Sequence, residues 1–412
     1  MYSDSRRGVL KKCIAAGSLG LSSGCLGTLG GSGDTVQFGA VLPLSGALAP
    51  LGQHGKRMVE QAASDVNAAG GIGGNDVEVT ILDTEANAET AVEQYGTLVD
   101  RGVIGFVGGL VSDASLALAP EAASDEIMEV SPASTAPQLS TAGQANGRKF
   151  FGRTVPSDGT QALVMAKVVD DSLYIDADSV ALLSLDNSFG AGLAEAQREA
   201  LDAEVVADVR YDPSSESFDD TLAEVFQNDP DAVSFTSVSG QERGILDAYS
   251  QSEYDVPWVL SAGMFGGDLP SYFEGFYSAS LSSARTQAYF ELVRRLPDID
   301  QPRAYSVNAY DALFLMACAA EQAGEASGPA IAETIQSVSG GSGHTVSVGD
   351  FGRVRSLTDA GRSVNYQGAS GGVDLTADLE PLSSYLIEQV NNGSVESLEL
   401  LQPQFFESGG NQ

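Results

Sequence analysis

The feature that most constrains the fold is a regular alternation, from residue 36 onward, of short apolar segments with longer amphipathic ones. Apolar segments at residues 36–44, 77–84 and 103–109 have the length and composition of strands. Residues 58–69 carry apolar side chains at spacings of three and four, which places them on one face of a helix. Strands that alternate with helices form a parallel sheet with helices on both faces. The sequence therefore predicts an α/β fold.

A second series of the same kind follows Arg153-Thr154-Val155-Pro156 and predicts a second doubly wound lobe. Its apolar segments lie at residues 179–186, 204–211, 232–237 and 256–262. A chain of 412 residues exceeds what one hydrophobic core usually organises, which also favours two lobes. Three later helical segments bring no clear third sheet, so we expect them to complete the first lobe. The chain would then cross between the lobes more than once.

The charge balance restricts the partners of the protein. The chain has 56 acidic and 21 basic residues, a formal net charge of -35, and 43% of its residues are hydrophobic. This composition predicts a folded domain with a strongly acidic surface, which repels nucleic acid and anionic membranes. Only five of the basic residues are Lys, and the Arg-rich acidic composition resembles that of proteins from extremely halophilic archaea. An acidic protein from a low-salt organism is the alternative.

The first 25 residues are predicted to be an export signal rather than part of the fold. Arg6 and Arg7 resemble a twin-arginine motif, and the apolar run at residues 14–21 is far shorter than the roughly 20 residues that span a bilayer. The sequence LSSGC that ends at Cys25 resembles a lipoprotein cleavage site, which would make Cys25 the lipid anchor. A soluble exported protein is the alternative. Residues 26–35 would form a Gly-rich tether.

The cysteines exclude a disulfide framework in the mature chain. Cys13 leaves with the signal and Cys25 would carry lipid, so Cys318 remains alone in an apolar helix. A single thiol forms neither an internal disulfide nor a cysteine metal cluster. We expect no metal and no cofactor.

Hydroxyl-rich segments follow two of the predicted strands. SPASTAP, residues 131–137, comes after the strand that ends in IMEV, and Ser112 follows the strand at residues 103–109. In open parallel sheets, ligands bind beyond the carboxyl ends of the strands, where helix N-termini and free amides converge. The two segments therefore predict one pocket at this edge of the sheet.

Enzyme motifs do not account for these hydroxyls. The chain has only two histidines, His54 and His344, and neither neighbours a nucleophile motif. The one match to G-x-S-x-G lies at residues 20–24, inside the predicted signal. The glycines of residues 68–79 follow a helix and precede a strand, whereas phosphate loops follow a strand and open a helix. We therefore expect a binding protein rather than an enzyme.

The order of several motifs resembles the leucine/isoleucine/valine-binding protein family, the type I periplasmic binding proteins of ABC importers. The motifs are PLSG, NAAGGIGG, SPASTAP, AYDALFLMACAAEQAG and YQGASG. The resemblance implies two α/β lobes joined by three hinge crossovers, near residues 153–154, 278–280 and 365–372. It places residues 36–153 and 281–366 in the first lobe, residues 154–280 and 367–402 in the second, and residues 403–412 in a tail.

The resemblance also implies which residues bind the ligand. Ser112, Ala133, Ser134 and Thr135 match the family positions that hold a ligand carboxylate. Phe189 and Tyr305 match aromatic residues of the family pocket. A packed loop residue is the alternative for Phe189, and an ordinary residue at a helix start is the alternative for Tyr305.

Three positions depart from the family pattern. Ala262 stands where the family has the Glu that accepts the ligand ammonium, and Val238 and Leu51 stand where the family has aromatic residues. We expect a ligand with a carboxylate that lacks the usual ammonium, unless Asp186 replaces the missing Glu.

These features predict a lipid-anchored receptor on the outer face of the cytoplasmic membrane. It would bind an amino acid, amide or small carboxylate in the cleft between the lobes and deliver it to the permease of an ABC importer. A ligand-sensing module of the same fold is the alternative, and an exported hydrolase is a more distant one.

The acidic surface predicts that the fold requires salt. Removal of residues 1–24 takes away four basic residues and one acidic residue, which changes the net charge to about -38. Because molar salt screens the repulsion among these charges, the melting temperature should fall steeply between about 3 M and about 0.1 M KCl. Thermal unfolding followed by circular dichroism measures this. An unchanged melting temperature would contradict the halophilic interpretation.

Overall fold

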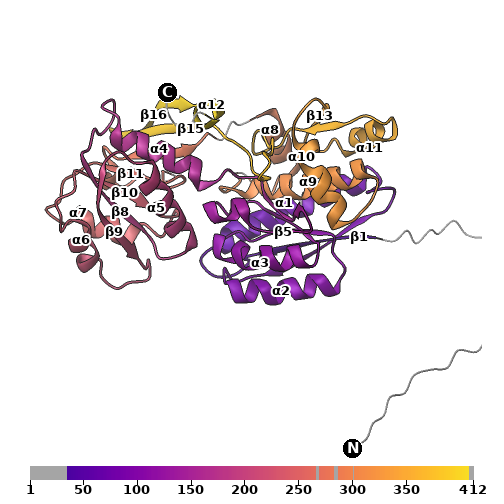
Figure 1. The fold of residues 1–412 in the computed structure, drawn as a ribbon, viewed down its shortest axis with the longest axis horizontal. Helices are drawn as coiled ribbons and strands as arrows, with labels where there is room; N and C mark the ends of the chain where they lie inside the picture. Colours follow the sequence, from indigo (N-terminus) through magenta and orange to yellow (C-terminus); the bar gives the residue numbers. More distant parts are fainter. Residues whose placement is uncertain (1–34, 266–268, 283–285, 300, 408–412) are drawn as a thin grey trace, which may run out of the picture. The chain divides into compact units, whose positions relative to one another are not determined.

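The computed structural model describes residues 35–265, 269–282, 286–299 and 301–407. The predicted export signal and Cys25 lie outside these residues, as does the predicted tether up to residue 34. The described chain forms two large sheets, each covered by helices on both faces (Figure 1). The predicted α/β class with two doubly wound lobes is confirmed.

The first sheet consists of parallel strands in the order β2-β1-β3-β4-β7. They are β1 (Val36–Leu42), β2 (Val77–Asp83), β3 (Gly105–Gly108), β4 (Met128–Ser131) and β7 (Phe151–Arg153). Helices α2 (Ala88–Asp100) and α3 (Ser112–Ser124) pack on one face through a core that contains Val41 and Phe106 (Figure 1). Between β4 and β7 lie the 3-10 turn η1 (Pro137–Thr141) and a small hairpin of β5 (Gln144–Ala145) and β6 (Arg148–Lys149).

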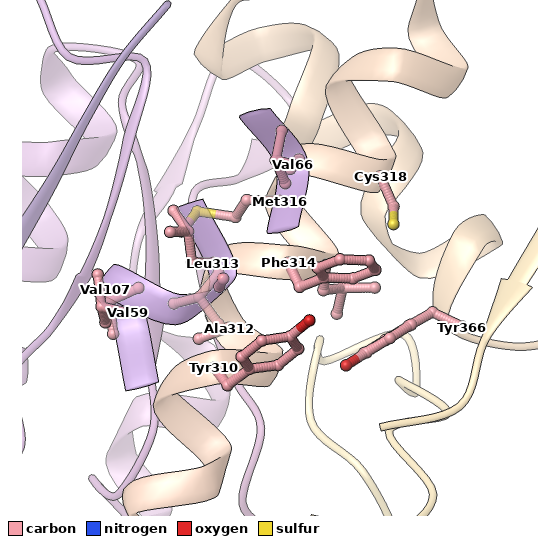
Figure 2. Close-up of a cluster of buried hydrophobic side chains, with 14 of the residues drawn as sticks. Val59, Val66, Val107, Tyr310, Ala312, Leu313, Phe314, Met316, Cys318 and Tyr366 are labelled. Atoms are coloured by element: carbon pink, nitrogen blue, oxygen red, sulfur yellow. The ribbon is translucent and has the colours of Figure 1, made fainter. Parts of the chain in front are cut away.

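Helix α9 (Ser306–Ala323) is the centre of the core on the other face. Fourteen of its 18 residues are buried, as expected for a helix that is apolar on all sides. Figure 2 shows Phe314 and Met316 of this helix among side chains that include Val66 of α1 (Ala49–Ala68). The same lobe contains α8 (Gln287–Arg295), α10 (Gly328–Ser339), α11 (Phe351–Asp359) and the short pair β13 (His344–Val346) and β14 (Val364–Tyr366). The late helices therefore complete the first lobe, as predicted.

The second sheet has the order β16-β15-β12-β11-β10-β8-β9. Its strands are β8 (Ser179–Leu185), β9 (Glu204–Tyr211), β10 (Ala232–Thr236), β11 (Trp258–Leu260), β12 (Tyr277–Leu281), β15 (Tyr385–Asn391) and β16 (Ser394–Leu401). Strands β8 to β12 are parallel, whereas β15 and β16 add an antiparallel hairpin that the sequence patterns did not predict. Helices α4 (Asp158–Asp170) and α5 (Ser188–Ala200) cover one face, and α6 (Asp219–Val225), α7 (Arg243–Ser250) and the turn η2 (Ser271–Phe273) cover the other.

The chain crosses between the lobes three times. The crossings run from β7 to α4, from β12 to α8, and from Leu379 to β15. The second crossing was expected near residues 278–280, but these residues belong to β12 and the chain leaves the second sheet after them.

The third crossing also lies later than predicted, because residues 369–379 pack on the first lobe rather than the second. Asp311 of α9 is fully buried, and its carboxylate accepts hydrogen bonds from the amides of Ala369 (2.9 Å) and Ser370 (2.7 Å). It also accepts one from the hydroxyl of Tyr366 (2.6 Å). A buried carboxylate requires such donors, so Asp311 fixes this segment to the first lobe.

The predicted tail begins with a packed helix. In α12 (Pro403–Glu407), Phe405 and Phe406 are buried against the same face of the second sheet as α4. The chain therefore stays folded beyond residue 402, and residues 408–412 lie outside the described part.

Arg153, at the end of β7, joins the first crossing to the third. Its side chain is fully buried and forms an ion pair with Glu380 at 2.5 Å. The guanidinium also donates hydrogen bonds to the carbonyl oxygens of Ser134 (3.2 Å) and Ala136 (3.0 Å) and to the hydroxyl of Ser140 (2.9 Å). Arg153 therefore holds the SPASTAP segment and the third crossing in one place.

Replacement of Arg153 should destabilise the protein more than replacement of an exposed arginine. Arg153→Met leaves Glu380 in a mostly buried position without its partner, so the free energy of unfolding should fall by about 3 to 5 kcal/mol. Arg148→Met is the matched control, because its partner Glu333 is 57% exposed, and it should cost no more than about 1 kcal/mol. Denaturant unfolding in molar KCl measures both. Equal losses would contradict the role given to Arg153.

Candidate functional site

A small serine network lies at the carboxyl ends of β3 and β4. The carbonyl oxygen of Gly109 accepts hydrogen bonds from the hydroxyls of Ser131 (2.7 Å), Ser134 (2.5 Å) and Ser115 (3.1 Å). Gly109 has a φ of +53°, and a Cβ atom there would lie 1.9 Å from Oγ of Ser115. Only glycine fits this position. The network fixes the SPASTAP segment beside the start of α3.

All four residues predicted to hold a carboxylate have hydrogen-bond partners within the protein. The amides of Ala133 and Ser134 donate to Oγ of Ser131 at 3.3 and 2.9 Å. Oγ of Ser112, the first residue of α3, accepts a hydrogen bond from the amide of Ala136 at 3.3 Å. Since this hydroxyl acts as an acceptor there, its own proton is available for donation. The binding role of these residues remains a prediction.

Thr135, the fourth predicted residue, lies beside a buried carboxyl group that the sequence analysis missed. This group is Asp158, the first residue of α4, which is 1% exposed. The amide of Asp158 donates to the carbonyl oxygen of Thr135 at 2.9 Å. The two residues therefore bring the SPASTAP segment and the first crossing together.

The carboxyl group of Asp158 has unused hydrogen-bonding capacity. Among the described residues, no partner contacts its Oδ2 atom. Burial raises the pKa of Asp158 to about 7, although the Thr135 side chain and the charge of Arg153 favour the ionised form. A buried carboxylate without a partner is costly, so this oxygen is suited to accept a donor from a ligand.

Two tyrosines lie near Asp158. Tyr305 precedes α9 and has a φ of +62°, which is a strained conformation for a tyrosine. Burial, followed by the charge of Asp158, raises the pKa of Tyr305 to about 12. Tyr385 begins β15, and its hydroxyl lies 3.4 Å from that of Thr160. Burial raises the pKa of Tyr385, and the charge of Asp158 contributes in the same direction.

The predicted residues of the second lobe have no described contact with this group. Phe189, in the first turn of α5, packs against the hydrophobic cores on both faces of the second sheet. Asp186 is exposed at the end of β8, and its amide donates to the carbonyl oxygen of Tyr211 at 3.0 Å. The lobes touch nearby, where Asp113 of α3 accepts hydrogen bonds from the amide (3.2 Å) and the hydroxyl of Ser188 in α5. No described contact links Asp186 to Asp158.

A cavity of about 440 Å³ lies where the three crossings meet. Its walls include residues 154–156 of the first crossing, residues 280–282 of the second and residue 383 of the third. Tyr305 lines it, but the other predicted site residues do not. Ala262 is also part of the wall, whereas Val238 and Leu51 pack against the cores of their own lobes. The volume lies within the range of small-molecule sites.

Two other hollows lie on the outer surfaces of the lobes, one along α1 and β2 and one along α6 and α7. Neither includes a strand end that carries a predicted site residue. In residues 35–407, apart from the gaps noted above, no group of three His, Cys, Asp or Glu side chains could hold a metal ion. None of the described helices is both long enough and apolar enough to cross a bilayer.

Asp158 and Arg153 are the buried charged residues at the candidate site that sequence reasoning missed. Both lie in the RTVPSD stretch, which was interpreted as the start of the second series of strands and, at residues 153–154, as the first crossing. The sequence feature that could have identified them is a charged residue on either side of an expected crossing between the lobes. Two charged side chains at a junction of three chain segments are candidates for burial. The hydrophobic periodicity of the sequence, however, does not predict the burial of charged residues.

Comparison with known proteins supports the same family. Residues 35–377 match the sequence profile of a family described as periplasmic binding protein. The chain is 41% identical to the chemotactic signal transduction system substrate-binding protein BasB of Halobacterium salinarum, over 382 residues that cover 92% of each protein.

Solved structures with the same fold include complexes with two kinds of ligand. A branched-chain amino acid transporter substrate-binding protein of Streptococcus pneumoniae, in complex with isoleucine, has a TM-score of 0.70 and 21% identity and covers 90% of this chain and all of its own. A solute-binding protein of an ABC transporter from R. palustris, in complex with benzoate, has a TM-score of 0.67 and 18% identity and covers 90% of this chain and 97% of its own.

Proposed function

We propose that this protein, which belongs to the periplasmic binding protein family, is an extracytoplasmic receptor for an amino acid. Members of this family bind solutes and are not enzymes, which agrees with the absence of a catalytic motif from the sequence. Two lobes that meet at three crossings allow closure around a ligand by hinge bending. Membership of the family does not identify the ligand, so the ligand is inferred from the chemistry of the site.

The observation that carries the proposal is the buried carboxyl group of Asp158. Its Oδ2 atom has no partner among the described residues, and it lies beside Thr135 and near Tyr305. An ammonium group supplies both the donors and the positive charge that a buried carboxylate requires. Asp158 would thus perform the task for which the sequence analysis offered only Asp186, which is exposed and has no described contact with Thr135.

The hydroxyls of the first lobe would hold the carboxylate of the same ligand. The proton of the Ser112 hydroxyl is available for this contact, whereas the Thr135 hydroxyl donates to Asp158 and supports the ammonium side. A carboxylate on the hydroxyl side and an ammonium on the Asp158 side are together the two charged groups of an amino acid. This proposal replaces the expectation of a ligand without an ammonium group, which was based only on Ala262 and Val238.

The cellular location is also part of the proposal. The twin-arginine motif and the sequence LSSGC support export followed by lipid anchoring at Cys25, which lies outside the described residues. The protein would then face outward from the cytoplasmic membrane, where its solute arrives. Membrane retention of a Cys25→Ser variant would contradict the anchor.

Two kinds of membrane partner fit such a receptor. The resemblance to Leu/Ile/Val-binding proteins supports an ABC permease. The 41% identical relative is named for a chemotactic signal transduction system, and this supports a signalling partner as the second candidate. Ligand uptake and swimming in a ligand gradient, measured in a strain without the gene, separate the two. Loss of uptake would identify an ABC permease as the partner. Loss of taxis with normal uptake would identify a signalling partner.

Asp158→Asn should weaken amino acid binding selectively. An amide cannot neutralise an ammonium group, so affinity for an amino acid should fall by about 1.5 to 3 kcal/mol, while affinity for its deaminated analogue should change little. Thr135→Val should weaken amino acid binding by about 1 to 3 kcal/mol, because it removes the hydroxyl that donates to Asp158 and favours its ionised form. Calorimetry in molar KCl, with leucine against 4-methylpentanoate and glutamate against glutarate, measures these effects.

Asp186→Asn is the matched control and should leave affinity unchanged, because Asp186 is exposed and has no described contact with the Asp158 group. Equal binding of an amino acid and its deaminated analogue would reject the amino acid assignment. Loss of amino acid binding in Asp186→Asn, with retention in Asp158→Asn, would restore the role first given to Asp186.

A further inference from the structure

We infer that Asn392, at the tip of the hairpin of β15 and β16, is an acceptor for an N-linked glycan on the second lobe. This modification is independent of the ligand. It rests on the exported location that forms part of the proposed function, because N-linked glycans are added to chains that leave the cytoplasm.

The sequence Asn392-Gly393-Ser394 matches the acceptor pattern N-x-S/T, in which x is any residue except Pro. The pattern supplies an amide as the acceptor and, two residues later, a hydroxyl that the transferase recognises. It is the only match in the 412 residues of the chain. Because a pattern of three residues also arises by chance, the position of this match in the fold decides its meaning.

The match lies in an exposed hairpin turn. Asn391 pairs with Ser394 across β15 and β16, so Asn392 and Gly393 form a two-residue loop (Figure 1). Their φ angles are +52° and +70°, which Asn and Gly adopt more readily than other residues in such turns. Asn392, Gly393 and Ser394 are all exposed. A large hydrophilic group attached here would displace no buried side chain.

The turn is held through its backbone and not through its side chains. The amides of Asn392 and Gly393 donate to the two carboxylate oxygens of Glu274 at 2.7 and 3.0 Å. Glu274 directly follows η2 of the same lobe and so fixes the loop on the second sheet. In the described chain, neither the side-chain amide of Asn392 nor the hydroxyl of Ser394 forms a hydrogen bond. The two groups that a transferase requires are therefore both available.

A second Asn-Gly turn in the first lobe shows which of these features the turn itself explains. Asn146 and Gly147 join β5 to β6 with φ angles of +51° and +74°, and they are also exposed. There the Asn146 amide donates to Glu126 at 3.0 Å, and the third residue is Arg148, which has no hydroxyl. Turn geometry accounts for Asn and Gly at both sites. It accounts neither for Ser394 nor for the unpartnered amide of Asn392.

The position on the second sheet also suits a glycan. Strand β16 is an edge strand, and it carries three apolar side chains that are between 39% and 47% exposed, namely Val395, Leu398 and Leu400. Such an edge is prone to pair with another chain. A hydrated glycan at the first turn of this edge would hinder that pairing. Asn392 is four residues beyond Glu388 of the cavity wall, about 13 Å along the strand, so the cavity would stay open.

The modification is a substitution at a sugar carbon. Nδ2 of Asn392 attacks the anomeric carbon of a glycosyl phosphate carried on a membrane lipid. The new C–N bond forms as the C–O bond to the phosphate breaks, and the lipid phosphate leaves with the electron pair. The proton lost from Nδ2 passes to a base of the transferase, and no group is oxidised or reduced.

The test uses the full chain isolated from the organism that encodes it. A protease specific for Glu cuts after Glu388 and Glu396 and releases residues 389–396, whose mass and fragmentation locate any sugar. The forms compared are the wild type, Asn392→Gln, Ser394→Ala, Ser394→Thr and Asn391→Gln. Asn391 is the matched control, because it is the neighbouring Asn and lies outside the pattern. The location of each form is measured by separation of membrane and cytoplasmic fractions.

We expect sugar units on Asn392 in most molecules of the wild type. Asn392→Gln and Ser394→Ala should both lose them, whereas Ser394→Thr and Asn391→Gln should keep them. Ser394→Ala retains Asn392 and the contacts of the turn with Glu274, so its loss of sugar cannot result from a misfolded hairpin.

An unmodified peptide from exported wild-type protein would overturn the inference and leave the proposed location standing. An unmodified peptide from protein retained in the cytoplasm would overturn both. Sugar that persists in Asn392→Gln or in Ser394→Ala would also contradict the inference. So would a wild-type mass change that corresponds only to conversion of Asn392 to Asp, which is a spontaneous reaction of Asn-Gly sequences.

Discussion

The structure depends on one buried charged contact at the junction of the lobes, the contact between Arg153 and Glu380. Arg153 ends the first sheet and Glu380 belongs to the third crossing, and the same guanidinium binds two carbonyl oxygens of the SPASTAP segment. A buried ion pair of this kind contributes little net stability over an apolar replacement, but it is costly to break. Its effect here is to fix the relative position of the chain segments that surround Asp158. The candidate site is therefore positioned by the crossings rather than by either sheet alone.

Charge acts in opposite directions on the surface and at the site. The acidic surface repels an anionic ligand at long range, although molar salt would reduce the range of that repulsion to a few ångströms. At short range, the hydroxyl of Ser112 offers a donor to a carboxylate, while Asp158 offers an acceptor to an ammonium group. Recognition would therefore depend on direct contacts inside the cleft and not on steering from a distance. Such contacts are the least affected by salt.

The sequence predicted the fold well because the fold follows from periodicity. Alternating strands and helices identified both sheets, and the apolar residues of α9 indicated a helix inside the core. The antiparallel pair β15 and β16 escaped prediction, because β16 is almost entirely exposed and carries no apolar alternation. The third crossing was misplaced because the buried carboxylate of Asp311 fixes it through contacts between residues far apart in the sequence. The same limit explains the site, where Thr135 and Tyr305 were predicted from motifs but Asp158 became visible only through its burial.

The central claim is that the Asp158 carboxylate receives the ammonium group of the ligand, and proton release on binding tests it most directly. Burial holds the pKa of Asp158 at about 7, so the group is partly protonated at neutral pH, and a bound ammonium should lower that pKa and expel the proton. Calorimetric titration at neutral pH, in two buffers of different ionisation enthalpy, gives the number of protons released per amino acid bound. We expect about half a proton for the wild type and none for Asp158→Asn. Binding without proton release by the wild type, or the same release by both proteins, would contradict the account.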